Sequence, residues 1–259
     1  MSVTQAEVEF FDIASNTPTT WSPNTAKTRM VLNYKRIPHK TTWLSYPDIA
    51  GTLESLGVAP SHSSSPLSFT CPAIRHSGAH VLMDSWPIAL YLDRTFTGAD
   101  SPSIFPTPGA LPLAQLVHHH LYSKVLPAAM KLLLPKIPAI LDDRGAEYFR
   151  RTRNEWFGKP LEELCEDPEG DWKRVGQEIA ILSDMLSGRW SAPQGVVIER
   201  AGPFFLGDVP SYADFVLVSF FQWFKCADER YLERVLAFGK EDCFTKLWNA
   251  CEQWVHVEH

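Results

Sequence analysis

The sequence predicts an α/β first part followed by an all-helical second part. Short β-prone runs and segments with helical spacing alternate in the first hundred residues. Residues 97–112 contain four prolines and two glycines, a composition typical of a linker. Beyond the linker, apolar residues recur almost throughout with the period of an α-helix. We therefore expect two domains, at residues 1–98 and 110–259.

The first part is expected to follow the order β-α-β-α-β-β-α. In chain order, the expected elements are a strand at residues 8–13, a helix at 25–37, a strand at 39–46, a short helix at 47–56, hairpin strands at 72–76 and 80–84, and a helix at 86–96. A Ser- and Pro-rich surface loop at residues 57–68 separates the short helix from the hairpin.

The second part predicts a bundle of helices, at residues 113–134, 147–165, 172–190 and 242–255, with an intensely apolar helix beginning near Tyr212. Ser211 and Asp214 have the spacing of a capping box, and Val209 is placed to act as a hydrophobic staple. A helix that is apolar on so many sides is expected to be central.

Composition excludes several classes of function. The chain has 259 residues and a formal net charge of −6, and no basic stripe is present to neutralise phosphates, so we expect no nucleic-acid partner. No apolar run approaches the ~20 residues needed to span a bilayer, and the N-terminus lacks the pattern of a signal peptide. We expect no membrane association and a cytoplasmic protein.

Cysteine and histidine patterns do not predict a disulfide framework or a metal site. The five cysteines are scattered and form no C-x-x-C pair. His118, His119 and His120 are consecutive on a predicted helix, so their side chains point in different directions and are not expected to chelate one metal ion. Such scattered cysteines are typical of a protein in the reducing cytosol.

The sequence Trp21-Ser22-Pro23-Asn24-Thr25 lies between the first strand and the first helix. A hydroxyl just before a proline that opens a helix lies where backbone N–H groups and the positive end of the helix dipole converge. Such a place stabilises an anion. The alternative is that Ser22 only caps the helix, as any serine in this position does by default.

These features together resemble the cytosolic glutathione transferase superfamily, over the whole chain. The features that carry the resemblance are Ser22-Pro23 after the first strand, Cys71-Pro72 before the third, Asp84-Ser85 before the third helix, and the box of Ser211 and Asp214. The segments at residues 21–25, 44–49 and 148–153 (WSPNT, LSYPDI and YFRRTR) are similar to the fungal serine-type class, called FuA, which is related to bacterial β-etherases. The resemblance implies a thioredoxin-like N-terminal domain, an all-helical C-terminal domain and a homodimer.

The resemblance also implies roles for particular residues. Ser22 would be the catalytic residue, donating a hydrogen bond to the thiolate of bound glutathione, with Asn24 or Thr25 supplying amide N–H groups. The other glutathione contacts it implies are the main chain of Cys71 beside a cis Pro72, Asp84 and Ser85 for the γ-glutamyl group, and Lys40 for the glycyl carboxylate. The implied co-substrate is glutathione, without a metal.

Three functions follow from this resemblance. The first is conjugation of glutathione to small apolar or aromatic electrophiles, in detoxification. The second is carriage of aromatic metabolites such as polyphenols with weak catalysis, and the third is glutathione-dependent cleavage of β-aryl ethers. Aromatic residues of the helical part are mostly core by default, although some are expected to line an acceptor pocket: Trp156, Phe157, Tyr212, Phe220, Phe221, Trp223 and Phe224. Thiol-disulfide exchange is disfavoured because it needs a cysteine where this chain has Ser22.

Overall fold

The N-terminal part of the chain is built on a four-stranded mixed sheet. The computed structural model describes residues 8–16, 19–61, 67–78, 80–189, 199 and 201–256. The strands are β1 (Val8–Ile13), β2 (His39–Leu44), β3 (Ala73–His76) and β4 (His80–Met83), in the spatial order β2-β1-β3-β4. β1 and β2 run parallel, whereas the pairs β1–β3 and β3–β4 are antiparallel.

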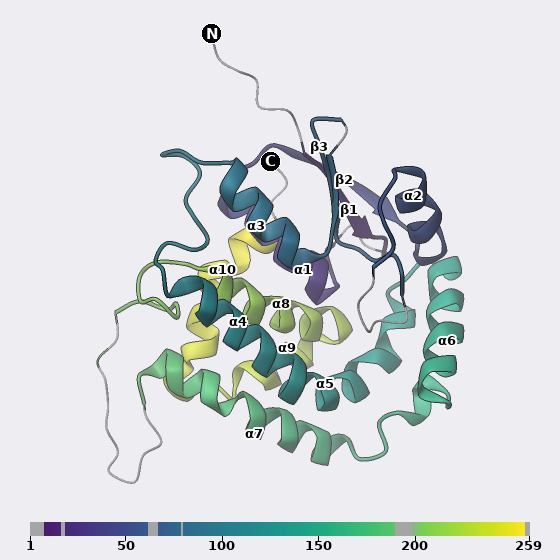
Figure 1. Cartoon of the computed structure of the whole chain (residues 1–259). Helices are drawn as coiled ribbons and strands as arrows, with labels where there is room; N and C mark the ends of the chain where they lie inside the picture. Colours follow the sequence, from purple (N-terminus) through teal and green to yellow (C-terminus); the bar gives the residue numbers. More distant parts are fainter. Residues whose placement is uncertain are drawn as a thin grey trace.

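Three helices pack around this sheet. α1 (Pro23–Tyr34) and α3 (Ser85–Thr95) lie on one side of it, and α2 (Ile49–Ser55) lies on the other (Figure 1). The observed order β1-α1-β2-α2-β3-β4-α3 confirms the predicted order. α1 lies beside the sheet (Figure 1) and contacts α3, α8 and α10, and every residue from Thr25 to Asn33 is buried.

The rest of the described chain is helical, as predicted. Its α-helices are α4 (Ala110–His120), α5 (Leu126–Leu133), α6 (Asp143–Phe157), α7 (Pro168–Ser187), α8 (Tyr212–Ala227), α9 (Glu229–Leu236) and α10 (Cys243–His256). A π-helical segment, Leu121–Val125, connects α4 to α5. In the part of the chain that the structure describes, no helix combines the length and the apolar character needed to cross a bilayer.

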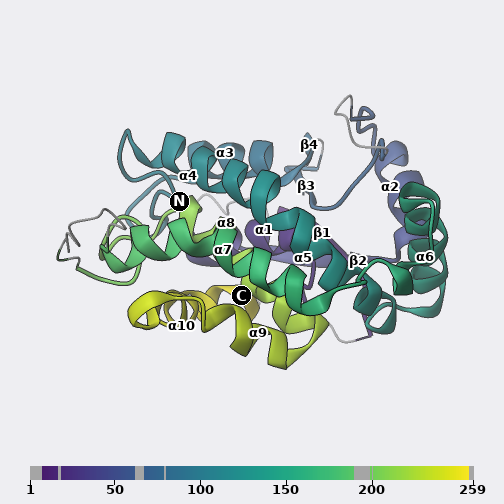
Figure 2. The same ribbon diagram turned by 90° about the horizontal axis from the view of Figure 1, so that it is seen from below.

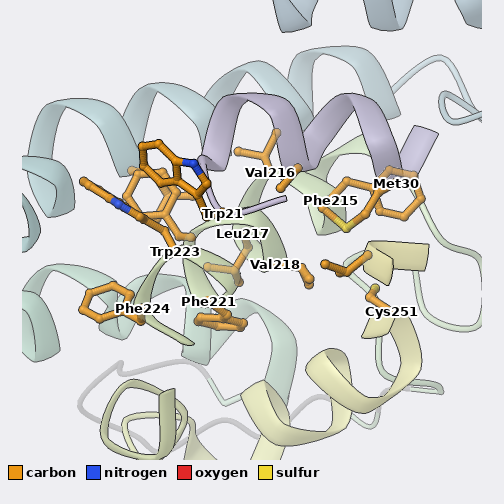
Figure 3. Packing of buried hydrophobic residues seen from close by; sticks show 14 of the residues in the cluster. Trp21, Met30, Phe215, Val216, Leu217, Val218, Phe221, Trp223, Phe224 and Cys251 are labelled. Atoms are coloured by element: carbon orange, nitrogen blue, oxygen red, sulfur yellow. The ribbon is translucent and has the colours of Figure 1, made fainter. Parts of the chain in front are cut away.

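α8 forms the centre of the helical part, and the predicted capping box holds its start. The carboxylate of Asp214 accepts hydrogen bonds from the backbone N–H and the hydroxyl of Ser211, each at 2.8 Å, and from the backbone N–H of Phe205 at 2.8 Å. Side chains leave α8 in several directions into the core, and Met30 of α1 lies beside Phe215 (Figure 3). α8 therefore connects the two parts of the chain through one continuous core.

The helix predicted at residues 113–134 is interrupted in the structure. α4 begins three residues earlier, at Ala110, and the backbone widens into the π-helical segment before α5. The N–H of Leu126 reaches back to the carbonyl of Leu121, five residues earlier. Pro127 follows at once, and it has no N–H with which to continue the regular α-helical bonding.

Two other helix predictions need correction, and one helix was missed. The helix predicted at 147–165 begins at Asp143 and ends at Phe157, because Gly158 adopts a left-handed conformation (φ 67°) that terminates it. The helix predicted at 172–190 begins at Pro168 and ends before Gly188, and Trp190 lies outside the described residues. α9 was not predicted, although Asp228 caps it by accepting a hydrogen bond from the N–H of Arg230.

Candidate functional site

Ser22 lies at the carboxyl end of β1, where the chain turns into α1. Its backbone is extended (φ −73°, ψ 134°), and its Oγ accepts a hydrogen bond from the N–H of Asn24 at 3.3 Å. Ser22 is therefore the N-cap of α1, as its default role predicts. Among the described residues the Ser22 hydroxyl has no acceptor for its own proton. An oxygen that already accepts from the helix N-terminus is a stronger donor, because the bond polarises its O–H group.

A buried ion pair fixes the turn that leads to Ser22. Asp12 and Arg29 are both buried, and Arg29 Nη2 lies 3.3 Å from Asp12 Oδ2. The hydroxyl of Thr20 donates to the same Asp12 oxygen at 2.5 Å, and the Nε of Arg29 contacts the Thr20 hydroxyl. From the helical part, Gln222 Nε2 donates to the carbonyl of Thr20 at 2.8 Å. Both parts of the chain therefore hold the residue two positions before Ser22.

Ser22 lines a cavity of about 250 Å³ between the end of the sheet and α6. The residues around it are Ile13, Ser22, Asn24, Tyr46, Ile49, Ala50, Leu67, Ser68, Phe69, Thr70, Cys71, Tyr148 and Arg153. Among these described residues no carboxylate is present, and Arg153 is the one charged side chain. Together with the N-terminus of α1, this charge distribution favours an anion in the cavity.

Cys71 borders the same cavity, and its peptide bond to Pro72 is cis. The side chain of Cys71 is buried, and burial raises the pKa of its thiol well above the ordinary value. The thiol therefore stays protonated near neutral pH, which argues against a reactive side chain at this position. The role expected for Cys71, through its main chain alone, is compatible with this environment.

Asp84 and Ser85 lie at the start of α3, next to the cavity rather than in its wall. The hydroxyl of Thr70, which lines the cavity, lies 3.4 Å from Asp84 Oδ1, and the N–H of Asp84 donates to the carbonyl of Pro72 at 3.1 Å. Asp84 has a left-handed backbone (φ 77°), and its side chain makes no capping bond to α3. The carboxylate is thereby left exposed beside the cavity rim.

Lys40 does not join this group of residues. It is exposed near the beginning of β2 and pairs in register with Glu9, whereas the cavity lies where Ile13 pairs with Leu44. Four residues along a strand correspond to about 13 Å. Lys40 instead borders a separate hollow with Glu9, Arg75 and Gly78. We therefore remove Lys40 from the candidate glutathione site, because strand register places it away from Ser22.

Lys27, one turn along α1 from Ser22, was not predicted as part of the site. Its side chain is completely buried, and Nζ lies 2.9 Å from Asn24 Oδ1 and 3.0 Å from the hydroxyl of Tyr122. Tyr122, in the π-helical segment, donates to the same Asn24 oxygen at 2.6 Å. Asn24 therefore keeps its carboxamide oxygen turned toward this pair. Its carboxamide nitrogen has no acceptor among the described residues, and Asn24 lines the cavity.

The buried Lys27 is expected to make the free energy of unfolding depend on pH. Burial lowers its pKa from 10.5 to about 7, partly opposed by the charge of Asp84. His118 stacks on Tyr122 beside it, and burial lowers the pKa of His118 to about 4, so His118 is neutral in this range. Between pH 7 and 10.5 the unfolded chain keeps the lysine proton that the folded chain has lost. The free energy of unfolding therefore rises with pH across this window.

Replacing Lys27 by Met removes that titration. We expect the free energy of unfolding of the wild type, relative to Lys27→Met, to increase by up to ~1.4 kcal/mol per pH unit between pH 7 and 10. Urea denaturation at several pH values measures this difference. Lys40→Met, at an exposed position, is the control and should follow the wild-type profile. Parallel profiles for wild type and Lys27→Met would contradict the assignment.

The aromatic residues that line the cavity are Tyr46, Phe69 and Tyr148. Tyr46 and Tyr148 stack with their ring centroids 6.1 Å apart, and both border the cavity. None of the seven aromatics expected as candidates for an acceptor pocket lines this cavity: five are buried in the core, Trp156 and Phe157 are partly exposed, and Phe157 lines a separate cavity. Tyr46 and Tyr148 lie in the segments at 44–49 and 148–153, which carried the resemblance to one class, whereas Phe69 lies outside both segments.

The three consecutive histidines have separate environments. His118 stacks on Tyr122, with the ring centroids 4.2 Å apart, and the Nε2 of His120 lies 2.6 Å from the carbonyl of Glu178. Within the described ranges, no three His, Cys, Asp or Glu side chains are grouped so that they could hold a metal ion.

Comparison with known proteins identifies the family. The model of the N-terminal domain of glutathione S-transferase matches residues 21–95, and that of the C-terminal domain matches residues 112–254. The glutathione S-transferase-like protein ustS of Aspergillus flavus is 40% identical over 97% of this chain and 92% of its own length.

Solved structures lead to the same family. A glutathione S-transferase of Ceriporiopsis subvermispora, in complex with glutathione, is 30% identical and superposes with a TM-score of 0.81, covering 97% of this chain and 98% of its own. Glutathione transferase GSTFuA3 from Phanerochaete chrysosporium is 28% identical with a TM-score of 0.83, covering 99% and 100% of the two chains. With its thioredoxin-like sheet, its helical second part and these matches, the chain belongs to the glutathione S-transferase family.

Proposed function

We propose that this protein is a serine-type glutathione transferase in which the hydroxyl of Ser22 donates a hydrogen bond to the thiolate of glutathione. The observation that supports this most is the Ser22 Oγ, which accepts from the helix N-terminus and has no acceptor for its own proton among the described residues. A free thiol has a pKa near ~8.5, and a charge-assisted bond at a helix N-terminus favours its thiolate. The thiolate would then attack a small electrophile.

The remaining glutathione contacts extend from Ser22. We propose that the main chain of Cys71, beside Pro72, pairs with the backbone of the tripeptide. Ser85 and the N-terminus of α3 would bind the γ-glutamyl carboxylate, and the exposed Asp84 would face its ammonium group. Asn24 would donate from the carboxamide nitrogen that its contacts with Tyr122 leave free.

Two measurements test this function together. The protein should be retained on immobilised glutathione and should conjugate glutathione to a chromogenic aromatic electrophile. Retention without turnover would contradict the catalytic proposal. If the protein showed no retention and no turnover, the proposed glutathione site would be wrong as well.

Converting Ser22 to Cys is expected to change the type of reaction. A cysteine at a helix N-terminus has a lowered pKa and attacks disulfides, so Ser22→Cys should gain thiol-disulfide exchange and deglutathionylation while losing conjugation. Release of glutathione from a mixed disulfide measures the gain. A Cys71→Ala background provides the control, because the new activity should persist without the buried thiol. No gain of exchange would place Ser22 outside the thiol site.

Carriage of aromatic ligands is the second candidate function. A second cavity, of about 420 Å³, lies between α5, the end of α6 and α7. Four apolar residues line it, together with charged ones: Pro127, Met130, Phe157 and Leu164, with Lys131, Lys159, Glu166, Asp167, Asp171 and Arg174. A phenolic ligand would place its ring against the apolar side chains and its hydroxyl among the charged ones. Thermal-shift measurements with polyphenols beside turnover assays separate the two: strong stabilisation with negligible turnover favours carriage. Cleavage of β-aryl ethers stays a prediction from the class resemblance.

Assembly and setting complete the proposal. We propose a cytoplasmic detoxification enzyme of fungal type that forms a two-fold homodimer, the commonest closed assembly. Its two domains would be residues 1–98 and 110–259. Light scattering at micromolar concentration tests the dimer, and a mass of one 29.2 kDa chain would contradict it.

A further inference from the structure

Arg153 on α6 is a buried cation without an anionic partner in the described part of the chain. Only 8% of the residue is exposed, yet it lines the cavity that contains Ser22. Its Nη1 donates one hydrogen bond, to the hydroxyl of Thr152 at 2.8 Å. A guanidinium carries more N–H donors than this single bond uses. Most of its donors are therefore available to a ligand.

Aromatic rings hold the guanidinium in place without neutralising it. The group lies over the rings of Phe149 and Trp156, at 4.2 and 4.3 Å from their centroids, and 5.2 Å from that of Tyr46. Burial lowers the pKa of Arg153, but an arginine at this position stays charged. An unpaired buried charge is costly, so an anion reaching this end of the cavity would gain a strong interaction.

Glutathione, in the pose proposed above, presents an anion that has no assigned partner. Its γ-glutamyl carboxylate is directed to Ser85, whereas its glycyl carboxylate lost its expected partner when strand register placed Lys40 in a separate hollow. Lys27 is completely buried and already bound to Asn24 and Tyr122. Among the described lining residues, Arg153 alone carries a charge of the required sign.

α6 is placed to supply this contact. It lies beside α2 in both views of the molecule, and it packs against the turn at Tyr46–Asp48 that precedes α2 (Figures 1 and 2). The guanidinium of Arg144 at the start of α6 pairs with Asp48, with Nη2 2.7 Å from Oδ1. The helix that carries Arg153 is thereby fixed against the wall of the cavity.

We propose that Arg153 binds the glycyl carboxylate of glutathione, so that the glutathione site is completed by a helix of the C-terminal part. This assignment rests on the proposed function of the cavity. A planar guanidinium pairs with a carboxylate through two parallel hydrogen bonds, which adds orientation to affinity.

Calorimetric binding of glutathione and of its glycyl ethyl ester tests the assignment. The ester keeps every group except the glycyl negative charge. The wild type should bind glutathione roughly 30-fold or more tightly than the ester, and Arg153→Met should bind both with the same weak affinity. Arg150→Met is the matched control, because Arg150 lies on the same helix, is half exposed and pairs with Glu162. It should keep the wild-type preference.

Each other outcome is decisive. Equal binding of glutathione and ester by the wild type overturns the role of Arg153 without any variant, so the test does not depend on the folding of Arg153→Met. A preference for glutathione that persists in Arg153→Met also overturns it. If Arg153→Met only raised the KM for the electrophile in steady-state turnover, Arg153 would be assigned to the electrophile instead. No binding of glutathione by the wild type would overturn the proposed function and this assignment with it.

Discussion

Replacing Ser22 by Ala is expected to lower the turnover of glutathione conjugation about 10²-fold. The substitution removes the hydroxyl that caps α1 and lines the cavity. The proton of this hydroxyl has no acceptor among the described residues. Without that donor the thiol of bound glutathione should return toward its free pKa of ~8.5, and less of it would be ionised at neutral pH. The ultraviolet absorbance of the thiolate, followed against pH in the binary complex, measures this shift directly.

Ser22→Gly separates catalysis from helix capping. Alanine is a poor N-cap and glycine a good one, so Ser22→Ala should cost about 1 kcal/mol of stability and Ser22→Gly only a few tenths. Both variants lack the hydroxyl, and both should lose turnover to the same degree. If Ser22→Gly retained most of the activity, the loss in Ser22→Ala would come from the weakened helix, and Ser22 would be a cap alone.

Local signals in the sequence were sufficient for most of the fold. Strand β1 was predicted with its observed bounds, and the capping box of Ser211 and Asp214 marked the start of the central helix. Local signals also explain the main errors. Gly158 and Asp228 are ordinary stop and start residues for helices, and neither was used, so α6 was predicted to run too far and α9 was not predicted.

The site was harder to predict, because it depends on how distant segments meet. Lys40 is close to Ser22 in the sequence but is separated from it by strand register, whereas Arg153 is distant in the sequence and lines the same cavity as Ser22. Lys27 looks like a residue of a solvated helix face. It is buried because the sheet and the helices α8 and α10 enclose α1, and no property of its neighbours in the sequence indicates that enclosure. The catalytic role of Ser22 stays a prediction.

Asp12→Ala is expected to have the largest effect on stability, about 3–5 kcal/mol of the free energy of unfolding. It would remove the carboxylate of Asp12 from the buried guanidinium of Arg29 and leave the hydroxyl of Thr20 without the acceptor that it has in the wild type. The N–H of Ile13, which donates to Asp12 Oδ1 at 2.7 Å, would lose its partner as well. Urea denaturation of the purified variant measures the loss.

A control variant distinguishes burial from ion pairing as such. Asp48 forms a two-bond pair with Arg144 at the surface, with N–O distances of 2.7 and 3.0 Å. Its geometry is at least as good as that of Asp12 with Arg29, but water solvates both groups when the pair is broken. Asp48→Ala should therefore change stability little. If Asp12→Ala and Asp48→Ala lowered the free energy of unfolding equally, burial of the charged groups would not be the cause of the loss in Asp12→Ala.

The double variant Asp12→Ala with Arg29→Met tests the mechanism further. Methionine removes the buried charge while keeping an apolar chain between the rings of Phe10 and Trp43, over which the Arg29 guanidinium lies. We expect the double variant to be more stable than Asp12→Ala alone, because most of the cost in the single variant comes from a buried guanidinium that has lost the carboxylate of Asp12. Its turnover should still fall, since Thr20 would no longer be fixed by Asp12 and Ser22 follows two residues later. Recovery of stability without recovery of turnover would show that the ion pair positions Ser22; recovery of both would show that it serves only the fold.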